Sequence, residues 1–374
     1  MLIPKHLVFA GGGPRCLSFL GSLEKLAEKG CSLDGVKHYW GNSAGALLAT
    51  FLSLKVPLPK LRMVFETLDY TRFRDIDLSN IVTFGDKWGL DSGDAFFVHM
   101  KELLETVKPG ASHYTLQEVP GLHITAADLT DNKMVILDGA TFPTLKVVDA
   151  LRSSTSLPFF YRPFRNPVNN HMLVDGAIGQ NFPWSLLPSD KDRDEALGFN
   201  FKTYDTTGEP RSLTEFIPKI LHFREAAAAH QAAASKVTPL SQSQSAIASG
   251  QSVTTSPLSV TTSPSGKKQH VHSPNIIVFN VRGFPAWHLG VNKEDRQELF
   301  AIGHKTTEEW LIARSASETQ SSQPPCAHQD TPPSLTPCSG ESSESHGCPR
   351  PLQRQGPPQG SPSLSGPVCR RWSV

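Results

Sequence analysis

The chain has 374 residues and a mass of 40.8 kDa, a length that suits one large domain or two small ones. Hydrophobic residues make up 38% of the chain and charged residues only 19%, which indicates an ordinary apolar core diluted by uncharged polar segments. The formal net charge of +1 argues against a dedicated nucleic-acid binder, because such proteins carry a clear basic excess. It does not exclude a neutral or lipid substrate.

Apolar runs and cysteines set further limits on the class of protein. The longest apolar stretch, residues 45–54, is too short for a membrane span, which needs roughly 20 residues. The N-terminal residues lack the extended apolar region of a secretory signal. The six cysteines form no C-x-x-C pair that would indicate a zinc site or a disulfide framework. These features predict a cytoplasmic protein and are compatible with peripheral association with a membrane.

The composition divides the chain into ordered and disordered parts. Turn residues separate apolar runs up to about residue 225, as in a globular domain. A Ser/Thr/Gln/Pro tract, clearest over 239–265, cannot bury enough apolar surface to offset the entropy of ordering. A buried strand is expected at Ile276–Val281 and a helix at Lys293–Ile312. Beyond Ser315 the chain is again rich in Ser, Pro and Gln.

The domain prediction follows from this division. We expect one domain over residues 1–314, interrupted by a low-complexity insertion at about 236–273. A disordered Ser/Pro-rich tail is expected over 315–374. We expect the insertion to lie on the surface, away from any chemistry.

The first 54 residues alternate strands and helices around two glycine turns. Leu7–Ala10 is expected to be a short apolar strand that enters Gly11-Gly12-Gly13, and leucines at helical spacing follow this turn. Val36–Trp40 is the second expected strand and enters Gly41-Asn42-Ser43-Ala44-Gly45, and a helix is expected at Ala46–Leu54. This order predicts a parallel βαβ arrangement, which brings both glycine turns to the same edge of the sheet.

The second turn fits the nucleophile elbow G-x-S-x-G. In that motif a serine sits at strained backbone angles with its hydroxyl exposed, here Ser43, and small residues flank it, here Gly41 and Gly45. The following helix directs N–H groups and a partial positive charge at the site. The motif also occurs by chance, so a purely structural helix start at Ser43 stays open.

The first turn has several interpretations. A phosphate loop requires a lysine that is absent, and a dinucleotide fingerprint requires a third glycine where Cys16 stands. Neighbouring glycines also suit an oxyanion hole, because their N–H groups are unobstructed, and Arg15 would add a positive charge. The structural alternative is a glycine turn that lets the helix pack closely on the sheet.

A serine nucleophile needs a base. Of the fourteen histidines, the late His288 and His304 lie in no recognisable loop motif. Asp175 ends a short apolar strand, and a partly desolvated carboxylate at a strand end can accept the serine proton. Taken alone, Asp175-Gly176 is also an ordinary turn signal.

These motifs together resemble those of the patatin-like phospholipases. The three motifs are the glycine turn with Arg15, the elbow around Ser43, and Asp175-Gly176-Ala177 far downstream. The resemblance covers roughly residues 5–313. Further segments similar to the family are residues 150–163, Asn181-Phe182-Pro183 and residues 293–311.

The resemblance implies a three-layer α/β/α fold with a mainly parallel central sheet. It implies that Ser43 is the nucleophile and Asp175 the general base, with Gly11, Gly12, Gly13 and Arg15 forming the oxyanion element. The expected reaction is hydrolysis of an acyl ester through an acyl-enzyme, with no catalytic histidine, no metal and no cofactor. The expected partners are a phospholipid or other lipid ester and, transiently, a membrane or lipid-droplet surface, and no nucleic acid.

Two residues depart from the family's glycine turn. Cys16 stands where the family usually has glycine, and its side chain can shift the following helix and loosen the oxyanion geometry. Pro14 removes one backbone donor, although its fixed φ suits the first position of a helix. The Cys16 departure leaves open a catalytically silent patatin-like interaction protein, and the Gly11–Gly13 turn leaves open a nucleotide-binding α/β protein.

Lipid access requires an apolar entrance to the site. Aromatic residues flank Asp175 in the sequence and can line an acyl groove, touch a bilayer or belong to the core. They are Phe159-Phe160-Tyr161, Phe182 and Trp184. Trp88-Gly89-Leu90 is a candidate lid.

Overall fold

A computed structural model describes residues 3–76, 82–202, 209, 219–220, 275–284 and 289–321. The described elements all belong to one unit within Met1–Ser322. The predicted insertion at about 236–273, the predicted tail beyond residue 321 and His288 lie outside the described residues.

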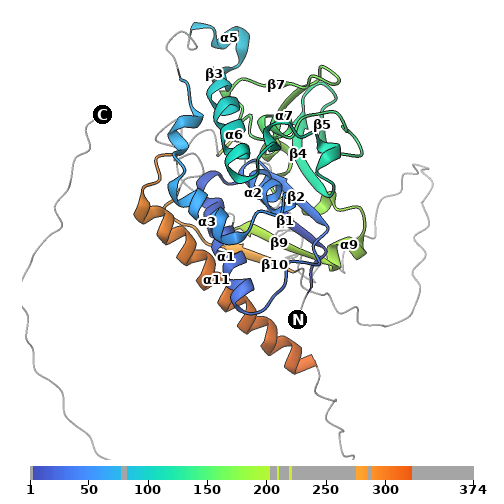
Figure 1. The fold of residues 1–374 in the computed structure, drawn as a ribbon, viewed down its shortest axis with the longest axis vertical. Helices are drawn as coiled ribbons and strands as arrows, with labels where there is room; N and C mark the ends of the chain where they lie inside the picture. The colour runs from blue at the N-terminus through green and yellow to red at the C-terminus, as the bar shows by residue number, and fades with distance from the viewer. Residues whose placement is uncertain are drawn as a thin grey trace, which may run out of the picture. The chain divides into compact units, whose positions relative to one another are not determined.

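The centre of the unit is an eight-stranded sheet with the order β10-β9-β1-β2-β4-β8-β7, and β5 pairs with β4 outside this path (Figure 1). The strands are β1 (His6–Phe9), β2 (His38–Asn42), β4 (Leu122–Asp128), β5 (Lys133–Asp138), β7 (Phe164–Arg165), β8 (Met172–Asp175), β9 (Ala196–Phe201) and β10 (Ile276–Phe279). The run from β10 to β4 is parallel, whereas β5, β8 and β7 pair antiparallel. A separate two-stranded sheet joins β3 (Gly89–Asp91) to β6 (Phe159–Tyr161).

Helices cover both faces of the sheet. The longer ones are α1 (Leu17–Glu28), α2 (Ala44–Ser53), α3 (Leu58–Thr67), α6 (Asp94–Val107), α7 (Val147–Ser154) and α11 (Lys293–Ser321). The shorter ones are η1 (Gly13–Cys16), η2 (Tyr70–Phe73), α5 (Phe84–Lys87), η3 (Ala111–His113), η4 (Leu116–Glu118), α8 (Ala177–Gln180), η5 (Pro183–Leu186) and α9 (Asp190–Asp194). The mainly parallel α/β fold expected from the sequence is confirmed.

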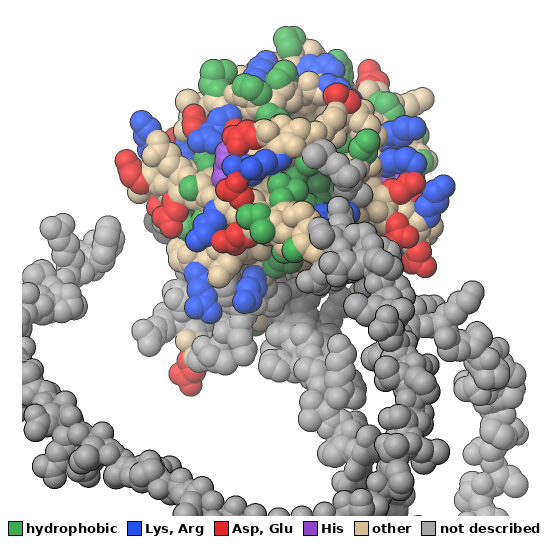
Figure 2. All heavy atoms as spheres, turned by 90° about the horizontal axis from the view of Figure 1, so that it is seen from below, with side chains coloured by type: hydrophobic (Ala, Val, Ile, Leu, Met, Phe, Trp, Pro, Cys, Tyr) green, Lys and Arg blue, Asp and Glu red, His purple; other side chains and the backbone are tan. Residues whose placement is uncertain are grey.

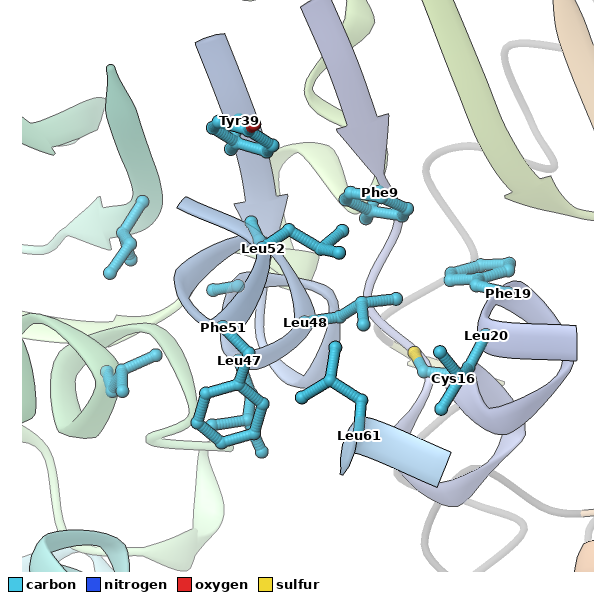
Figure 3. Close-up of a cluster of buried hydrophobic side chains, with 14 of the residues drawn as sticks. Phe9, Cys16, Phe19, Leu20, Tyr39, Leu47, Leu48, Phe51, Leu52 and Leu61 are labelled. Carbon is cyan, nitrogen blue, oxygen red and sulfur yellow. The ribbon is translucent and has the colours of Figure 1, made fainter. Parts of the chain in front are cut away.

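The side-chain alternation of β1 separates two apolar layers. Leu7 and Phe9 point into the main core with α1 and α2, whereas Val8 belongs to a smaller cluster with Trp40 and Leu187 on the other face. Figure 3 shows part of the main core around Phe9. Each fully buried Phe or Leu side chain contributes about 1.5–3 kcal/mol relative to exposure, so the larger cluster supplies more of the hydrophobic stabilisation than the smaller one.

The C-terminal elements complete this core. Helix α11 runs along α1 (Figure 1), and the two approach closely because Gly303 leaves no side chain against the backbone of Ser18. The helix ends at Ser321, beyond the Ile312 end expected for it and beyond the predicted start of the tail at 315.

Strand β10 differs from the expectation of a buried strand. It lies at the edge of the sheet and pairs only with β9 within the described residues. Val278 is 49% exposed, whereas its neighbours Ile277 and Phe279 are fully buried. A continuous apolar run does not by itself distinguish a strand buried on both faces from one buried on a single face.

Two further observations concern the charge of the surface and the length and polarity of the helices. On the described part of the face in Figure 2, Lys and Arg side chains are interspersed with Asp and Glu. Within the described residues, each helix is too short or too polar to cross a bilayer.

Candidate active site

The elbow around Ser43 has the geometry that the sequence predicts. Ser43 lies between β2 and α2 with φ 52° and ψ −127°, a positive φ that is uncommon and strained for a residue other than glycine. The two flanking positions require glycine because a side chain at either one would collide with the backbone. A Cβ atom at Gly41 would lie 2.5 Å from the Gly45 carbonyl oxygen, and one at Gly45 would lie 2.5 Å from that of Ala10. Ser43 itself is only half-buried.

A second serine, Ser154, accepts a hydrogen bond from the backbone of the elbow. The Ser43 N–H donates to Ser154 Oγ at 2.8 Å, and this hydroxyl donates in turn to the Thr125 carbonyl at 2.7 Å. Ser154 is the last residue of α7 and is fully buried. The backbone amide of the strained serine therefore has a fixed partner. The sequence placed Ser154 in a family-like segment but gave no indication of this contact.

Asp175 lies at the end of β8 and is 1% exposed. Its Oδ1 accepts hydrogen bonds from the Ala177 N–H at 2.9 Å and from Asn42 Nδ2 at 3.1 Å. Its own N–H donates to the Ser156 carbonyl at 2.9 Å. Because Asn42 precedes Ser43, the structure brings the predicted nucleophile and the predicted base to the same edge of the sheet.

The glycine turn approaches the elbow closely. A Cβ atom at Gly11 would lie 3.0 Å from the Ser43 Cβ. The Gly11 N–H already donates to the Asn181 carbonyl at 3.2 Å. By contrast, no acceptor within the described residues takes the N–H groups of Gly12 and Gly13. Two of the three glycine N–H groups in the predicted oxyanion element thus have no acceptor among the described residues.

Arg15 acts on this turn through its side chain. Its Nε donates to the Gly12 carbonyl at 3.2 Å, and its guanidinium lies 4.5 Å from the centre of the Phe201 ring. In a trans peptide the carbonyl and the following N–H point in opposite directions. Holding the Gly12 carbonyl therefore also sets the direction of the Gly13 N–H.

Cys16 and Pro14 both fit the turn. Pro14 occupies one of the first two positions of η1, as its fixed φ predicts. The Cys16 side chain points into the core near Leu48 and Leu61 (Figure 3), and its Sγ lies 3.7 Å from the Ala10 carbonyl oxygen. Burial raises the pKa of this thiol to about 12, although Arg15 opposes the shift. Helix α1 starts directly after it at Leu17, so the turn accommodates the thiol that we expected to disturb it.

The aromatic residues near Asp175 divide into core and surface. Tyr161 is 7% exposed and its hydroxyl donates to the Phe73 carbonyl at 2.8 Å, so it is a core residue. Phe182 and Trp184 stack on each other and pack against the core. Phe159 and Trp88 are about half exposed.

The predicted lid is part of the small sheet. Trp88 has a φ of 57° and directly precedes β3, in which Gly89 pairs with Phe159 of β6. Phe159 also has a positive φ, at 70°. The segment 88–90 is therefore joined by strand pairing to the aromatic segment that precedes Asp175 in the sequence.

Two other groups of ionisable residues have structural partners. His304 of α11 contacts Glu24 of α1 at 3.2 Å, in the interface between these helices. Asp128, Asp131 and His171 lie close enough to share a metal ion. However, His171 Nδ1 already contacts Asp128 at 2.7 Å, and Lys133 pairs with Asp131 at 2.8 Å. These contacts account for the cluster without a metal.

Comparison with known proteins identifies the family. Residues 7–188, which contain the glycine turn, the elbow and Asp175, match the model of the patatin-like phospholipases. Residues 7–188 of this chain therefore form a patatin-like phospholipase region. The recognition that the three sequence motifs suggested is confirmed.

Individual relatives are distant. The chain is 27% identical over 201 residues to the uncharacterized protein YqhO of Bacillus subtilis, covering 50% of this chain and 67% of that one. It is 26% identical over 186 residues to "Probable lipid hydrolase 463L" of Invertebrate iridescent virus 6, covering 48% and 61%. The chain thus spans about two thirds or less of the length of these relatives.

Among solved structures, the chain is similar to VipD from Legionella pneumophila, with a TM-score of 0.50 and 18% identity. The match covers 83% of this chain and 67% of VipD. This similarity supports the patatin fold.

Proposed function

We propose that the protein hydrolyses acyl esters of lipids, with Ser43 as the nucleophile and Asp175 as the general base. The patatin-like phospholipase region at residues 7–188 supports a lipid ester hydrolase. The name of the viral relative, a probable lipid hydrolase, points the same way. One observation carries the finer mechanism: the strained, half-exposed Ser43 follows Asn42, whose amide binds the buried Asp175.

The first half-reaction forms an acyl-enzyme. Ser43 Oγ attacks the ester carbonyl carbon while its proton moves to the Asp175 carboxylate. The N–H groups of Gly12 and Gly13 and the start of α2 stabilise the negative charge that develops on the carbonyl oxygen. The carbon–oxygen bond to the alcohol then breaks, and Asp175 returns the proton to the leaving alcohol.

The second half-reaction releases the acyl group. A water molecule gives its proton to Asp175 as its oxygen attacks the acyl-enzyme carbonyl. The same N–H groups stabilise the second tetrahedral intermediate, which collapses to a fatty acid and free Ser43. Removing a single oxyanion donor typically costs about 10²–10³ in rate, so the orientation of the glycine turn is a large part of the mechanism.

A fluorescent fluorophosphonate tests this proposal, because it labels only an activated serine. Wild type is compared with Ser43→Ala and Asp175→Asn, and phospholipid turnover is followed on the same samples with and without EDTA. We expect label and fatty-acid release in wild type only, both insensitive to EDTA. A folded wild type that neither labels nor releases fatty acid would favour the alternative, a catalytically silent interaction protein.

A further inference from the structure

Asn42, the residue that the G-x-S-x-G pattern leaves unspecified, is fully buried beside the predicted base. Its Nδ2 donates to Asp175 Oδ1 at 3.1 Å and to Asn181 Oδ1 at 3.3 Å. Its Oδ1 accepts a hydrogen bond from Thr125 Oγ1 at 3.2 Å. Because an ionised carboxylate only accepts hydrogen bonds, the NH₂ group of Asn42 faces Asp175. The Thr125 hydroxyl, which also lies 3.3 Å from the Gly41 carbonyl, is then next to the amide oxygen.

Asn181 extends this contact to the glycine turn. Its Nδ2 donates to the Gly11 carbonyl at 3.0 Å, and its own carbonyl accepts the Gly11 N–H at 3.2 Å. The contacts therefore run from Asp175 through Asn42 and Asn181 to Gly11. They join the three motifs that lie far apart in the sequence.

The hydrogen bonds from Asp175 through Asn42 to Asn181 form a bridge, and two glycines beside this bridge give an independent observation. A Cβ atom at Gly176 would lie 2.2 Å from Asn42 Oδ1, and one at Gly11 would lie 2.6 Å from Asn181 Oδ1. Contacts below 3.0 Å are essentially never seen for real Cβ atoms. The backbone on both sides therefore leaves the space that the two amides occupy.

We propose that Asn42 is a positioning residue of the active site, whose amide orients the Asp175 carboxylate and, through Asn181, fixes the glycine turn relative to the elbow. This inference rests on the proposed function. An N–H donor stabilises the ionised form of a carboxylate, which is the form that accepts a proton. A fully satisfied buried amide also has one favoured orientation, so the carboxylate is held in place before substrate binds.

Asn42→Asp tests the bridge by replacing the NH₂ donor with an oxygen of similar size. Two carboxylates then face each other, and their repulsion disfavours ionisation of both. With a water-soluble short-chain ester, we expect kcat to fall about 100-fold with KM within about twofold. We expect the acidic limb of the pH–rate profile to move to higher pH by about one unit or more.

Asn166→Asp is the matched control. Asn166 is 1% exposed, like Asn42, but its Oδ1 accepts the Val168 N–H in the loop between β7 and β8. It therefore undergoes the same chemical change at a similar depth, away from the dyad. We expect its kcat and pH profile to match wild type, so that a general cost of burying a new carboxylate is separated from an effect on Asp175.

A reversed pair tests the contact without relying on activity. Asn42→Asp and Asp175→Asn are combined, which restores an amide–carboxylate contact with exchanged polarity. We expect each single variant to lower the melting temperature by about 5 °C and the double variant to recover most of that loss. The double variant remains inactive, because residue 175 is then an amide.

The two measurements separate the two proposals. If wild type hydrolyses no ester, the proposed function fails, and the melting temperatures still decide whether Asn42 and Asp175 interact. Additive losses in the double variant would overturn the bridge. So would an Asn42→Asp enzyme that is folded and keeps the wild-type kcat and pH profile.

Discussion

The two ends of the parallel strands β1, β2 and β4 carry two different polar networks. At the carboxyl end of β2 lie the half-exposed Ser43 and the buried Asn42, which pairs in register with the buried Thr125 of β4. At their amino ends lie His6 and His38, which pair in register between β1 and β2, and His123 of β4. Parallel pairing brings equivalent ends together in both cases.

The amino-end network is a stack of rings. His6 and His38 stack at 4.6 Å between ring centres, and His38 and His123 at 5.3 Å. His38 Nδ1 lies 3.1 Å from His123 Nε2, and His123 Nδ1 lies 2.9 Å from Asp138 Oδ2. Burial of the charged form lowers the pKa of both His6 and His38. Burial would by itself raise the pKa of Asp138, but hydrogen bonds from His123 and Thr141 lower it to about 2.

The two ends differ in whether their polar groups have hydrogen-bond partners. The carboxyl end has a strained serine and, among the described residues, two glycine N–H groups without an acceptor. At the amino end, ring nitrogens bind one another, Asp138 and the Trp40 indole, which donates to His6 at 3.3 Å. Strain and open donors favour a role in chemistry, and mutual satisfaction favours a role in stability.

The largest expected effect tests the difference between the two ends directly. Ser43→Ala removes the proposed nucleophile and should lower kcat by about 10⁴-fold or more. His38→Gln at the other end of the same strand should leave kcat within about twofold. Ester turnover by the two purified variants measures both values. Comparable losses in the two variants would show that the two ends are not functionally distinct.

The next effect concerns Ser154, whose hydroxyl accepts the Ser43 N–H. Ser154→Ala leaves the Ser43 N–H without its partner and should lower kcat by about 10–100-fold, with KM nearly unchanged. Ser153→Ala is the control, because Ser153 is equally buried but its hydroxyl donates to the Asp149 carbonyl within its own helix. Equal losses from the two substitutions would show that the Ser43 contact has no special role.

A smaller effect should appear in stability against pH. Because the folded-state pKa of His6 and of His38 lies below 6.5, the unfolded chain binds protons first as pH falls. Stability from this region is therefore complete above about pH 6.5 and is lost as pH falls through the folded-state pKa values.

Thermal unfolding between pH 7.5 and 5 measures this loss. We expect His38→Gln to flatten the profile, and His113→Gln, at an exposed histidine of η3, to leave it unchanged. A profile that is as steep in His38→Gln as in wild type would exclude this histidine as a source of the slope.

The smallest effect concerns Cys16. Its buried, protonated thiol should resist alkylation by iodoacetamide in the folded protein. Ester turnover should therefore stay within about twofold after long exposure to the reagent, and mass spectrometry of peptides should find modified Cys16 only after unfolding. Alkylation of Cys16 in folded protein, with loss of activity, would place a reactive thiol beside the glycine turn.

The sequence predicted those parts of the site that depend on neighbouring residues in the chain. The elbow and the glycine turn are short motifs between periodic apolar segments, and both lie where the expected strands end. The contacts of Ser154 and Asn42 were not predicted, because they depend on the packing of α7 beside β4 and on the antiparallel pairing of β8 with β4. The histidine stack was missed for the same reason, since each histidine considered alone has no distinctive surroundings.

The position of β1 between β2 and β9 has a consequence for protein synthesis. The family match ends at residue 188, before β9 begins at Ala196. Until β9 leaves the ribosome, β1 has an unpaired edge, and Phe9 lacks Phe199, whose ring lies 4.8 Å away in the finished fold. An open strand edge of this kind invites pairing with other chains. A recombinant fragment that stops at residue 188 would therefore keep the glycine turn, the elbow and Asp175 but aggregate during expression.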